Sequence, residues 1–420
     1  MKHRALCRGR TLPAAFTIGL LLLPSGVGSL TAQEEPESPA GASIPDAGQE
    51  EAIAKGVAVL LGLQEGLHGE GSPEEWPYEG VYRVRGEIPI GYRVGGTAIC
   101  AWALLEAPRW DEDEARREAV ARALDFILIT IQDELMAADF RGRYDVRGWG
   151  HTYALSFLLR ARELGRIPRR REKIVKKAII FLIDALERTE IPDRGGWNYS
   201  RRGGGSRPSS PSTFMTAPTL QALFAAGAQG FRVEAGVLER ALQSLEDARL
   251  ETGAFQYGSA PEKKSGTGFE ALPGAIGRMP VCETTLLLAG RGSTERVRGA
   301  IDAFFEHWEW LEKRRKQIGT HKKPYSIAPY YFFFAHYYAA QAIAMLPEEE
   351  QEARRRRLLG LLFKVREASG GWNDRVFPRS ENFGTAMSLL ALCQPKMPLP
   401  AGWTPAEKKK SGRREKKRYL

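Results

Sequence analysis

Gly195-Gly196-Trp197-Asn198-Tyr199 is the stretch that decides the fold, because it recurs along the chain. Gly370-Gly371-Trp372-Asn373-Asp374 is nearly identical, and Gly253-Ala254-Phe255-Gln256-Tyr257 has the same order with Phe in place of Trp. Looser copies are Glu75-Trp76-Pro77-Tyr78, Gly148-Trp149-Gly150 and Lys323-Pro324-Tyr325. A turn of fixed pattern that returns about every 45–75 residues is typical of a repeat fold.

Helical patterns lie on both sides of these turns. Between about residues 50 and 395 the apolar residues follow a helical period, without sustained alternation of period two. We expect about twelve helices. They begin near Glu51, Gly91, Asp111, Gly150, Pro168, Ser212, Val233, Ile276, Ser293, Ala328, Pro347 and Asn382.

The expected helices alternate between two kinds. Those that run into the Gly-Trp turns are amphipathic and charged, as in residues 170–188 and 354–364, whereas those that follow are apolar almost all round, as in residues 97–105. A striped helix lies on the outside of a protein and an apolar one is buried. The alternation predicts an all-α fold, an α6/α6 toroid of six helical hairpins. A helical solenoid is the alternative, but it explains the two kinds of helix less well.

The helices before the turns carry a longer pattern. Lys55-Gly56, Leu60 and Gln64 follow the QW motif of the prenyltransferase and squalene/hopene cyclase repeat, and three further copies match it in part. Those copies are Lys177-Ala178 with Phe181, Arg240-Ala241 with Leu245, and Leu359-Gly360 with Phe363, each followed by its Gly-aromatic turn. The body therefore resembles this family over its whole length. The resemblance implies an α/α toroid with a central cavity.

The two ends of the chain differ from the body. Residues 1–32 combine four basic residues with a short apolar run, which predicts a signal peptide and a secreted or periplasmic protein; a retained membrane anchor is the alternative. Residues 33–50 have the composition of a flexible linker. We place the toroid at 51–395 and a basic disordered tail at 396–420.

The net charge of +10 comes from these ends, since the last sixteen residues hold eight Lys or Arg and two Glu. The body is near neutral, so we do not expect nucleic acid as a partner. The tail could contact an anionic cell surface or membrane, although a solvated tail is the simpler interpretation. After cleavage Cys100, Cys282 and Cys393 remain, an odd count that does not indicate a disulfide framework.

In a toroid the amino-terminal ends of the inner helices form one rim of the cavity. Helix dipoles at that rim favour an anion or a developing negative charge. The expected inner helices bring polar and aromatic groups there, which we take as candidate catalytic residues: His151, Glu283, His336 and Tyr331. Cys282 and His336 are also candidate metal ligands, because thiolate and imidazole are the ligands that zinc prefers.

The family resemblance bears on the metal. Protein prenyltransferases hold zinc with an Asp, a Cys two residues later and a later His, and Cys282 and His336 fall in comparable places. The Asp is missing, because Pro280 stands two residues before Cys282, and Glu283 has a different helical direction. The cofactor is therefore unknown, with zinc as one candidate. An unidentified ligand in the central cavity is the expected partner.

Other reactions of related toroids find partial support. The cyclases protonate a polyene with Asp-x-Asp-Asp, but the acidic cluster at 111–114 opens an outer helix, so terpenoid cyclisation is not expected. The thioester motif Cys-Gly-Glu-Gln of the complement family is absent. Glycan-active toroids need two carboxylates, or one with Tyr, His or Arg, across a cleft. The candidates are Asp145, Arg147, His151, Asp193, Glu283, Tyr325 and Asp374.

Two functions remain open from the sequence. The first is a secreted ligand- or protein-binding module that uses the toroid cavity, which the missing catalytic motifs favour. The alternative is an enzyme with its site at the inner-helix rim, either a glycan lyase or hydrolase or a zinc-dependent transferase.

Overall fold

A computed structural model describes residues 46–66, 74–139, 146–199, 210–258 and 267–404. Within these ranges the chain forms helices, short turns and isolated bridges but no strand. The α-helices are α1 (Asp46–Gly62), α2 (Ile90–Glu106), α3 (Glu114–Thr130), α4 (Arg147–Glu163), α5 (Glu172–Thr189), α6 (Thr213–Ala228), α7 (Ala235–Asp247), α8 (Leu272–Ala275), α9 (Met279–Leu288), α10 (Thr294–Glu312), α11 (Tyr331–Ala344), α12 (Glu348–Lys364) and α13 (Glu381–Cys393).

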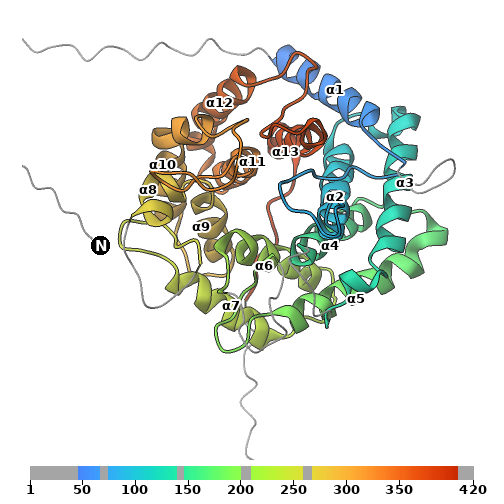
Figure 1. Ribbon diagram of the computed structural model, residues 1–420, viewed down its shortest axis with the longest axis horizontal. Helices are drawn as coiled ribbons and strands as arrows, with labels where there is room; N and C mark the ends of the chain where they lie inside the picture. Colours follow the sequence, from blue (N-terminus) through green and yellow to red (C-terminus); the bar gives the residue numbers. More distant parts are fainter. Residues whose placement is uncertain (1–45, 67–73, 140–145, 200–209, 259–266, 405–420) are drawn as a thin grey trace, which may run out of the picture. The chain divides into compact units, whose positions relative to one another are not determined.

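The long helices form two concentric rings (Figure 1). The inner ring consists of α2, α4, α6, α9, α11 and α13, and the outer ring of α1, α3, α5, α7, α10 and α12. Each inner helix contacts the next, and α13 contacts α2, so the inner ring closes. The predicted α6/α6 toroid is confirmed. A solenoid is excluded because its first and last repeats would not meet.

Burial separates the two rings as the sequence pattern predicted. All residues of the inner helix α11 except its last are buried, whereas the outer helix α12 buries only Leu358 and Leu362. An outer helix needs one apolar stripe, because only one of its faces meets the inner ring. An inner helix is enclosed by both its ring neighbours and the outer layer.

Most predicted helix starts lie within a few residues of the observed ones. The Ser293 hydroxyl accepts a hydrogen bond from the Arg296 N–H and caps α10, as its position in the sequence suggested. The predicted turn at Gly148-Trp149-Gly150 is wrong, because these residues form the first turn of α4. The short helix α8 was not expected.

A shared set of hydrogen bonds, which we call the tryptophan clamp, fixes three of the hairpins. In each clamp the indole Nε1–H donates to a carbonyl near the end of the outer helix: Trp76 to Leu60 at 2.7 Å, Trp197 to Leu186 at 2.7 Å and Trp372 to Leu362 at 2.8 Å. The backbone N–H of the same Trp donates to a threonine hydroxyl on the inner helix: Thr97, Thr216 or Thr385. In each clamp the indole therefore adds a second donor to a helix-end carbonyl, which also accepts from a backbone N–H three or four residues later.

The turn around each clamp also depends on local chemistry. Gly195 has φ +73°, and a Cβ there would lie 2.2 Å from the carbonyl oxygen of Arg240, so no other residue fits. The Asn198 amide donates to the Ser210 carbonyl, and the Asn373 amide donates to the Phe377 carbonyl. Both asparagines therefore bind local backbone.

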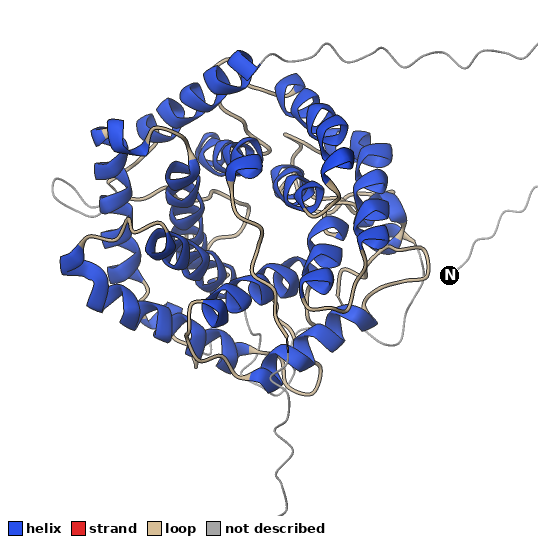
Figure 2. Ribbon diagram, turned by 180° about the vertical axis from the view of Figure 1, so that it is seen from behind, coloured by secondary structure: helices blue, strands red, loops and turns tan. Residues whose placement is uncertain are grey.

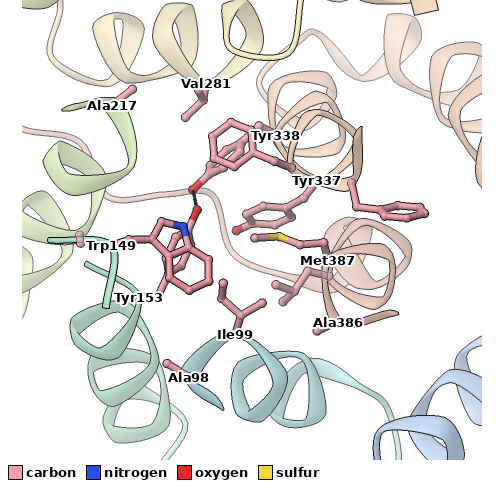
Figure 3. Packing of buried hydrophobic residues seen from close by; sticks show 14 of the residues in the cluster. Ala98, Ile99, Trp149, Tyr153, Ala217, Val281, Tyr337, Tyr338, Ala386 and Met387 are labelled. Carbon is pink, nitrogen blue, oxygen red and sulfur yellow. Dashed lines mark hydrogen bonds between the residues drawn. The ribbon is translucent and has the colours of Figure 1, made fainter. Parts of the chain in front are cut away.

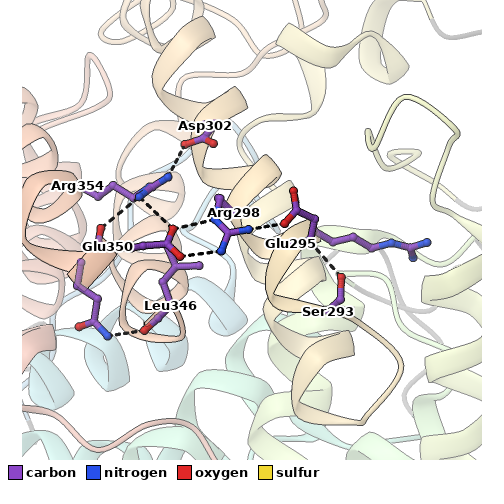
Figure 4. A network of polar contacts seen from close by, with 9 residues as sticks. Ser293, Glu295, Arg298, Asp302, Leu346, Glu350 and Arg354 are labelled. Atoms are coloured by element: carbon purple, nitrogen blue, oxygen red, sulfur yellow. Dashed lines mark hydrogen bonds and ion pairs between the residues drawn. The ribbon is translucent and has the colours of Figure 1, made fainter. Parts of the chain in front are cut away.

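Ion pairs connect neighbouring outer helices in a regular order (Figure 4). Between α10 and α12, Arg298 pairs with Glu350 and Arg354 with Asp302, and Lys364 pairs with Glu312 further along. Each pair joins residues 52 positions apart, so the two helices run parallel in constant register. Such pairs are partly solvated and contribute little each, about 0–1 kcal/mol.

Side chains fill the middle of the inner ring (Figure 3). Tyr337, Tyr338 and Met387 from α11 and α13 face Trp149 and Tyr153 from α4, and all five are buried. The hydroxyls of Tyr153 and Tyr338 lie 3.3 Å apart. The central cavity expected from the sequence is therefore not one open channel.

The segment after α13 crosses the ring towards α6 and α9 (Figures 1 and 2). The Trp403 N–H donates to the Leu288 carbonyl at 3.0 Å, and the Trp403 ring stacks on Phe224 at 6.0 Å. Packed structure therefore continues past residue 396, where we placed the start of the tail, at least as far as Trp403.

Several predictions fall on residues outside the described ranges. These are the signal peptide, nearly all of the linker, and the tail from residue 405 onwards, and they stay predictions. Among the helices of the described ranges, none has the length and apolar character that crossing a bilayer requires.

Trp372→Phe tests the tryptophan clamp. The substitution keeps an aromatic ring in place but removes the Nε1–H donor, so the Leu362 carbonyl is left with only the Val365 N–H, at 3.3 Å. We expect a loss of about 1–2 kcal/mol in the free energy of unfolding, measured by urea denaturation. Trp310→Phe on the outer helix α10 is the control. Equal losses in the two variants would contradict a role for the clamp.

Candidate functional site

Aromatic side chains converge at one end of the inner ring, where the inner helices begin. Nine of them line a cavity of about 30 Å³, and we call this set the aromatic mouth: Tyr78, Tyr82, Tyr92, Trp149, Tyr199, Phe214, Tyr330, Phe334 and Phe383. They come from α2, α4, α6, α11, α13 and the turns before these helices. Pockets that enclose a whole drug-sized ligand are about 300–1,000 Å³. This cavity therefore holds a group about the size of one water molecule, and a larger head group enters only if the surrounding rings move apart.

The repeat itself places part of the mouth. The residue two positions after the aromatic of each turn is Tyr78, Tyr199, Tyr257 or Asp374. Tyr78 and Tyr199 line the mouth, and Tyr257 packs on the mouth residue Phe214 with ring centroids 5.9 Å apart. Asp374 is close enough to act electrostatically on Tyr78. One repeat position thus directs three phenols and one carboxyl to the same region.

The rings of the mouth pack closely. Tyr78 lies 4.6 Å from Phe383 and meets Tyr92 edge-on at 5.2 Å, and Tyr92 meets Trp149 edge-on at 5.5 Å. Gly95 of α2 makes room for Trp149, since a Cβ there would lie 2.3 Å from the indole. Edge-to-face contacts leave the negative π face of one partner open to other groups.

Asp374 is the carboxyl group that sequence reasoning placed among the glycan candidates, and its surroundings are unusual. The side chain is fully buried, and neither carboxylate oxygen has a hydrogen-bond partner. Burial raises the pKa of Asp374 to about 7, although the charges of Arg375 and Arg315 oppose the shift. Such a group changes its charge near neutral pH.

Arg375 borders the same region. Its guanidinium lies over the ring of the mouth residue Tyr330 and over that of Phe377, at 5.6 Å from each centroid. The buried Tyr78 hydroxyl has no hydrogen-bond partner by geometry, and burial together with the nearby Asp374 raises the pKa of Tyr78. The mouth therefore combines a polar group in need of a partner with rings that already hold a cation.

A second polar group adjoins the mouth through His321. The hydroxyls of Tyr330 and Tyr331 lie 3.3 Å from its Nε2 and Nδ1, and the Ser326 carbonyl lies 2.9 Å from Nδ1. Burial lowers the pKa of His321, and the guanidinium groups of Arg278 and Arg314 act in the same direction. This imidazole is therefore neutral at physiological pH.

Of the four predicted catalytic residues, one lies at the mouth. Tyr331 stacks on Phe214 at 4.2 Å. The other three bind partners elsewhere: His151 binds the Met136 carbonyl at 2.8 Å, Glu283 binds Arg249, and His336 binds Trp308. Met136 precedes α4, Arg249 follows the outer helix α7, and Trp308 lies in the outer helix α10. The three side chains therefore do not meet at one site.

The predicted zinc ligands are not supported. The His336 Nε2 accepts from the Trp308 indole at 2.8 Å, and its Nδ1 binds the Phe332 carbonyl at 2.7 Å, so both ring nitrogens are used. Cys282 is buried, and burial raises the pKa of its thiol. Over the described residues no group of three His, Cys, Asp or Glu could hold a metal ion.

The remaining glycan candidates also lie apart. Glu283 is paired with Arg249, Arg147 donates to the Ala137 carbonyl, Tyr325 packs against Trp310, and Asp193 is a turn residue with φ +63°. Asp145 lies outside the described residues. None of the described residues that line the mouth is a second carboxylate to complement Asp374.

Sequence reasoning did not single out the mouth, but a signal was present. The signal is the residue two positions after the Trp or Phe of each turn. Three tyrosines and one aspartate at that position would have indicated a common location.

No protein-family model and no curated protein matches this chain. Solved structures do resemble it. The α-1,6-mannanase GH76A of Salegentibacter sp. HEL1_6, in complex with α-1,6-mannotriose, gives a TM-score of 0.52 at 10% identity over 82% of this chain and 99% of the mannanase. The Lin0763 protein of Listeria innocua gives 0.51 at 13% identity over 83% and 97%. The fold is an α/α toroid.

A type II terpene cyclase from Scytonema, in complex with geranylgeranyl dihydroxybenzoate, also matches. Its TM-score is 0.47 at 14% identity, over 84% of this chain and 99% of the cyclase. At such low identities the mannanase and the Lin0763 protein show a shared fold and carry no residue roles.

Asp374→Asn should change how stability depends on pH. A carboxyl with a pKa near 7 in the folded protein and about 3.9 in the unfolded chain makes folding less favourable as pH rises between these values, by up to about 4 kcal/mol. The variant lacks this titration, so its stability relative to wild type should rise from pH 4 to pH 8. Urea denaturation at several pH values measures the difference, and a pH-independent difference would contradict the raised pKa.

His336→Phe tests whether His336 is a core residue or a metal ligand. Losing the acceptor leaves the buried Trp308 N–H unsatisfied, which should cost about 1–3 kcal/mol. Adding Trp308→Phe should recover part of the loss, since no unpaired donor remains. Melting of the wild type with and without a chelator completes the test. A melting temperature that the chelator lowers would support zinc instead.

Proposed function

We propose that this chain is a ligand-binding toroid whose site is the aromatic mouth, and that the ligand inserts an organic cation such as a substituted ammonium group. The observation that carries the proposal is the convergence of nine aromatic side chains on one small cavity beside the buried Asp374. π faces attract cations, and aromatic cages bind quaternary ammonium groups for this reason. The narrow cavity excludes a sugar ring or a prenyl chain, and an ammonium group enters it as the surrounding rings move apart.

Charge supports the same ligand class. Arg375 already lies over Tyr330, so at least one ring of the mouth accepts a cation. Asp374 supplies a negative charge once it ionises, near pH 7. Arg375 and an incoming cation compete for the negative charge of Asp374. Binding of the cation should therefore become tighter as pH rises, and tighter still when Arg375 is removed.

The wider setting of this function rests on the sequence. We propose that the protein is secreted or periplasmic, as the N-terminal pattern predicts, and that it is a divergent relative of the prenyltransferase and squalene cyclase repeat proteins. The QW-type turns, with their tryptophan clamps, support that relationship.

Choline and its neutral isostere, in which carbon replaces the ammonium nitrogen, provide the test. By calorimetry at pH 8 we expect choline to bind at least about tenfold more tightly than the isostere. Trp149→Leu should abolish choline binding, and Ile180→Ala on the outer face of α5 is the matched control. Asp374→Asn should weaken binding and remove its pH dependence, whereas Arg375→Gln should strengthen it.

Equal binding of the two compounds would contradict a cation site. Choline binding that survives Trp149→Leu would place the site elsewhere.

One observation favours a second candidate, an enzyme with Asp374 as general acid. A buried carboxyl with a pKa of about 7 keeps its proton at near-neutral pH and can deliver it to a substrate. The toroid of the α-1,6-mannanase suggests the substrate to try. Hydrolysis of α-1,6-mannotriose that falls above pH 7 and is lost in Asp374→Asn would replace the binding function. The described mouth lacks the second carboxylate that this reaction needs.

A further inference from the structure

The opposite end of the inner ring holds a second cavity, of about 280 Å³, which we call the C-face chamber. Its walls come from the carboxyl-terminal halves of α2, α4, α6 and α11, and residues 397–401 cover it. Trp149 of the mouth and Ser156 of the chamber lie on the same helix α4, and between them Tyr153 contacts Tyr338. The chamber is therefore separate from the aromatic mouth.

Aromatic rings and small apolar side chains form much of the lining of the chamber. Trp102 meets Tyr337 edge-on with ring centroids 5.7 Å apart, and Tyr338 lies beside them. Ala222 and Ala225 on α6 have small side chains facing the chamber, which leaves its volume open. A volume at the lower end of the range for ligand pockets, about 300–1,000 Å³, suits a molecule with one or two rings.

The polar atoms of the chamber are mostly committed to one another. The Gln221 amide N–H groups donate to Thr285 Oγ1 and Gln341 Oε1, at 3.0 Å each. Arg160 is paired with Glu106 at 2.6 Å and with Glu163 at 2.9 Å. The charge that lines the chamber is thus balanced, and an ionic ligand would find no counter-ion without breaking these pairs.

One polar atom is left over. Gln394 lines the chamber with only 3% of its surface exposed, and its Oε1 has no hydrogen-bond partner. A buried carbonyl oxygen without a donor costs about 1–3 kcal/mol. A ligand in the chamber that carries an N–H or O–H group would remove this cost once the Gln394 side chain turns and brings Oε1, which is buried in the wall, to the chamber surface.

The covering segment is fastened on both sides of the chamber. It follows directly from α13 and the turn Gln394–Lys396, and it ends where Trp403 stacks on Phe224 and donates to the Leu288 carbonyl. The segment thereby covers one side of the chamber, which is otherwise partly open to solvent.

We propose that the C-face chamber is a binding site for a neutral, single-ring molecule with a hydrogen-bond donor, such as a phenol, and that Gln394 accepts the hydrogen bond. The chemistry differs from that of the aromatic mouth, because no charge is involved. The site does not depend on the function proposed for the mouth.

Phenol and anisole test the proposal on the full chain, since anisole has the same ring but no O–H. By ligand-observed magnetic resonance titration we expect phenol to bind about tenfold more tightly than anisole, the worth of one buried hydrogen bond. Gln394→Met, close in size but without the oxygen, should remove the difference between the two. Ala225→Phe should fill the chamber and abolish binding of both.

Trp149→Leu separates the two sites. Phenol binding should survive this variant, which alters only the mouth; its loss would mean that phenol occupies the mouth, and the proposal would fall. The proposal is also overturned if phenol and anisole bind alike to the wild type, or if a folded Ala225→Phe protein binds phenol as the wild type does. If Ala225→Phe does not fold, Gln394→Met decides the outcome alone.

Discussion

The hydrogen bond from a tryptophan indole to the last turn of an outer helix is the interaction on which the rest of this structure depends. It joins the end of the outer helix to the turn, and the same residue's backbone N–H joins the turn to a threonine of the inner helix. An outer and an inner helix are thus joined through one residue in three of the six hairpins. Contacts between successive inner helices close the ring.

The clamp also fixes where side chains near the turn must point. Because Trp76, Trp197 and Trp372 are held at both ends, the residue two positions later enters the ring at the mouth in each case. The clamp does not involve the side chain of that residue. Tyrosine at two of these positions and aspartate at the third leave the clamp unchanged, although the buried Asp374 carboxyl lowers stability once it ionises.

The sequence was sufficient for the architecture but not for the site. Periodicity and the repeated turn predicted the number, order and layering of the helices, because each depends on short-range pattern. The direction of a side chain on an apolar helix does not follow from a short-range pattern, because every face of α11 is buried. Five residues turn the helix by more than a full rotation. Tyr331 consequently faces the mouth, whereas His336 faces Trp308 in the outer layer. The burial and pKa of Asp374 depend on residues from distant repeats, which no local pattern reveals.

The closure of the ring gives every hairpin two neighbours, so the six hairpins are equivalent in their connections around the ring, although only three carry the clamp. Gln49 in the first helix donates to the carbonyl of Leu392 in the last helix. The first and the last hairpin therefore contact each other as consecutive hairpins do. The contacts around the ring therefore do not show which hairpin comes first in the chain. Only the segment that leaves α13 and runs to Trp403 breaks this equivalence, because it spans the ring instead of following it. This segment distinguishes the last hairpin from the other five and so gives the nearly symmetric ring a defined end.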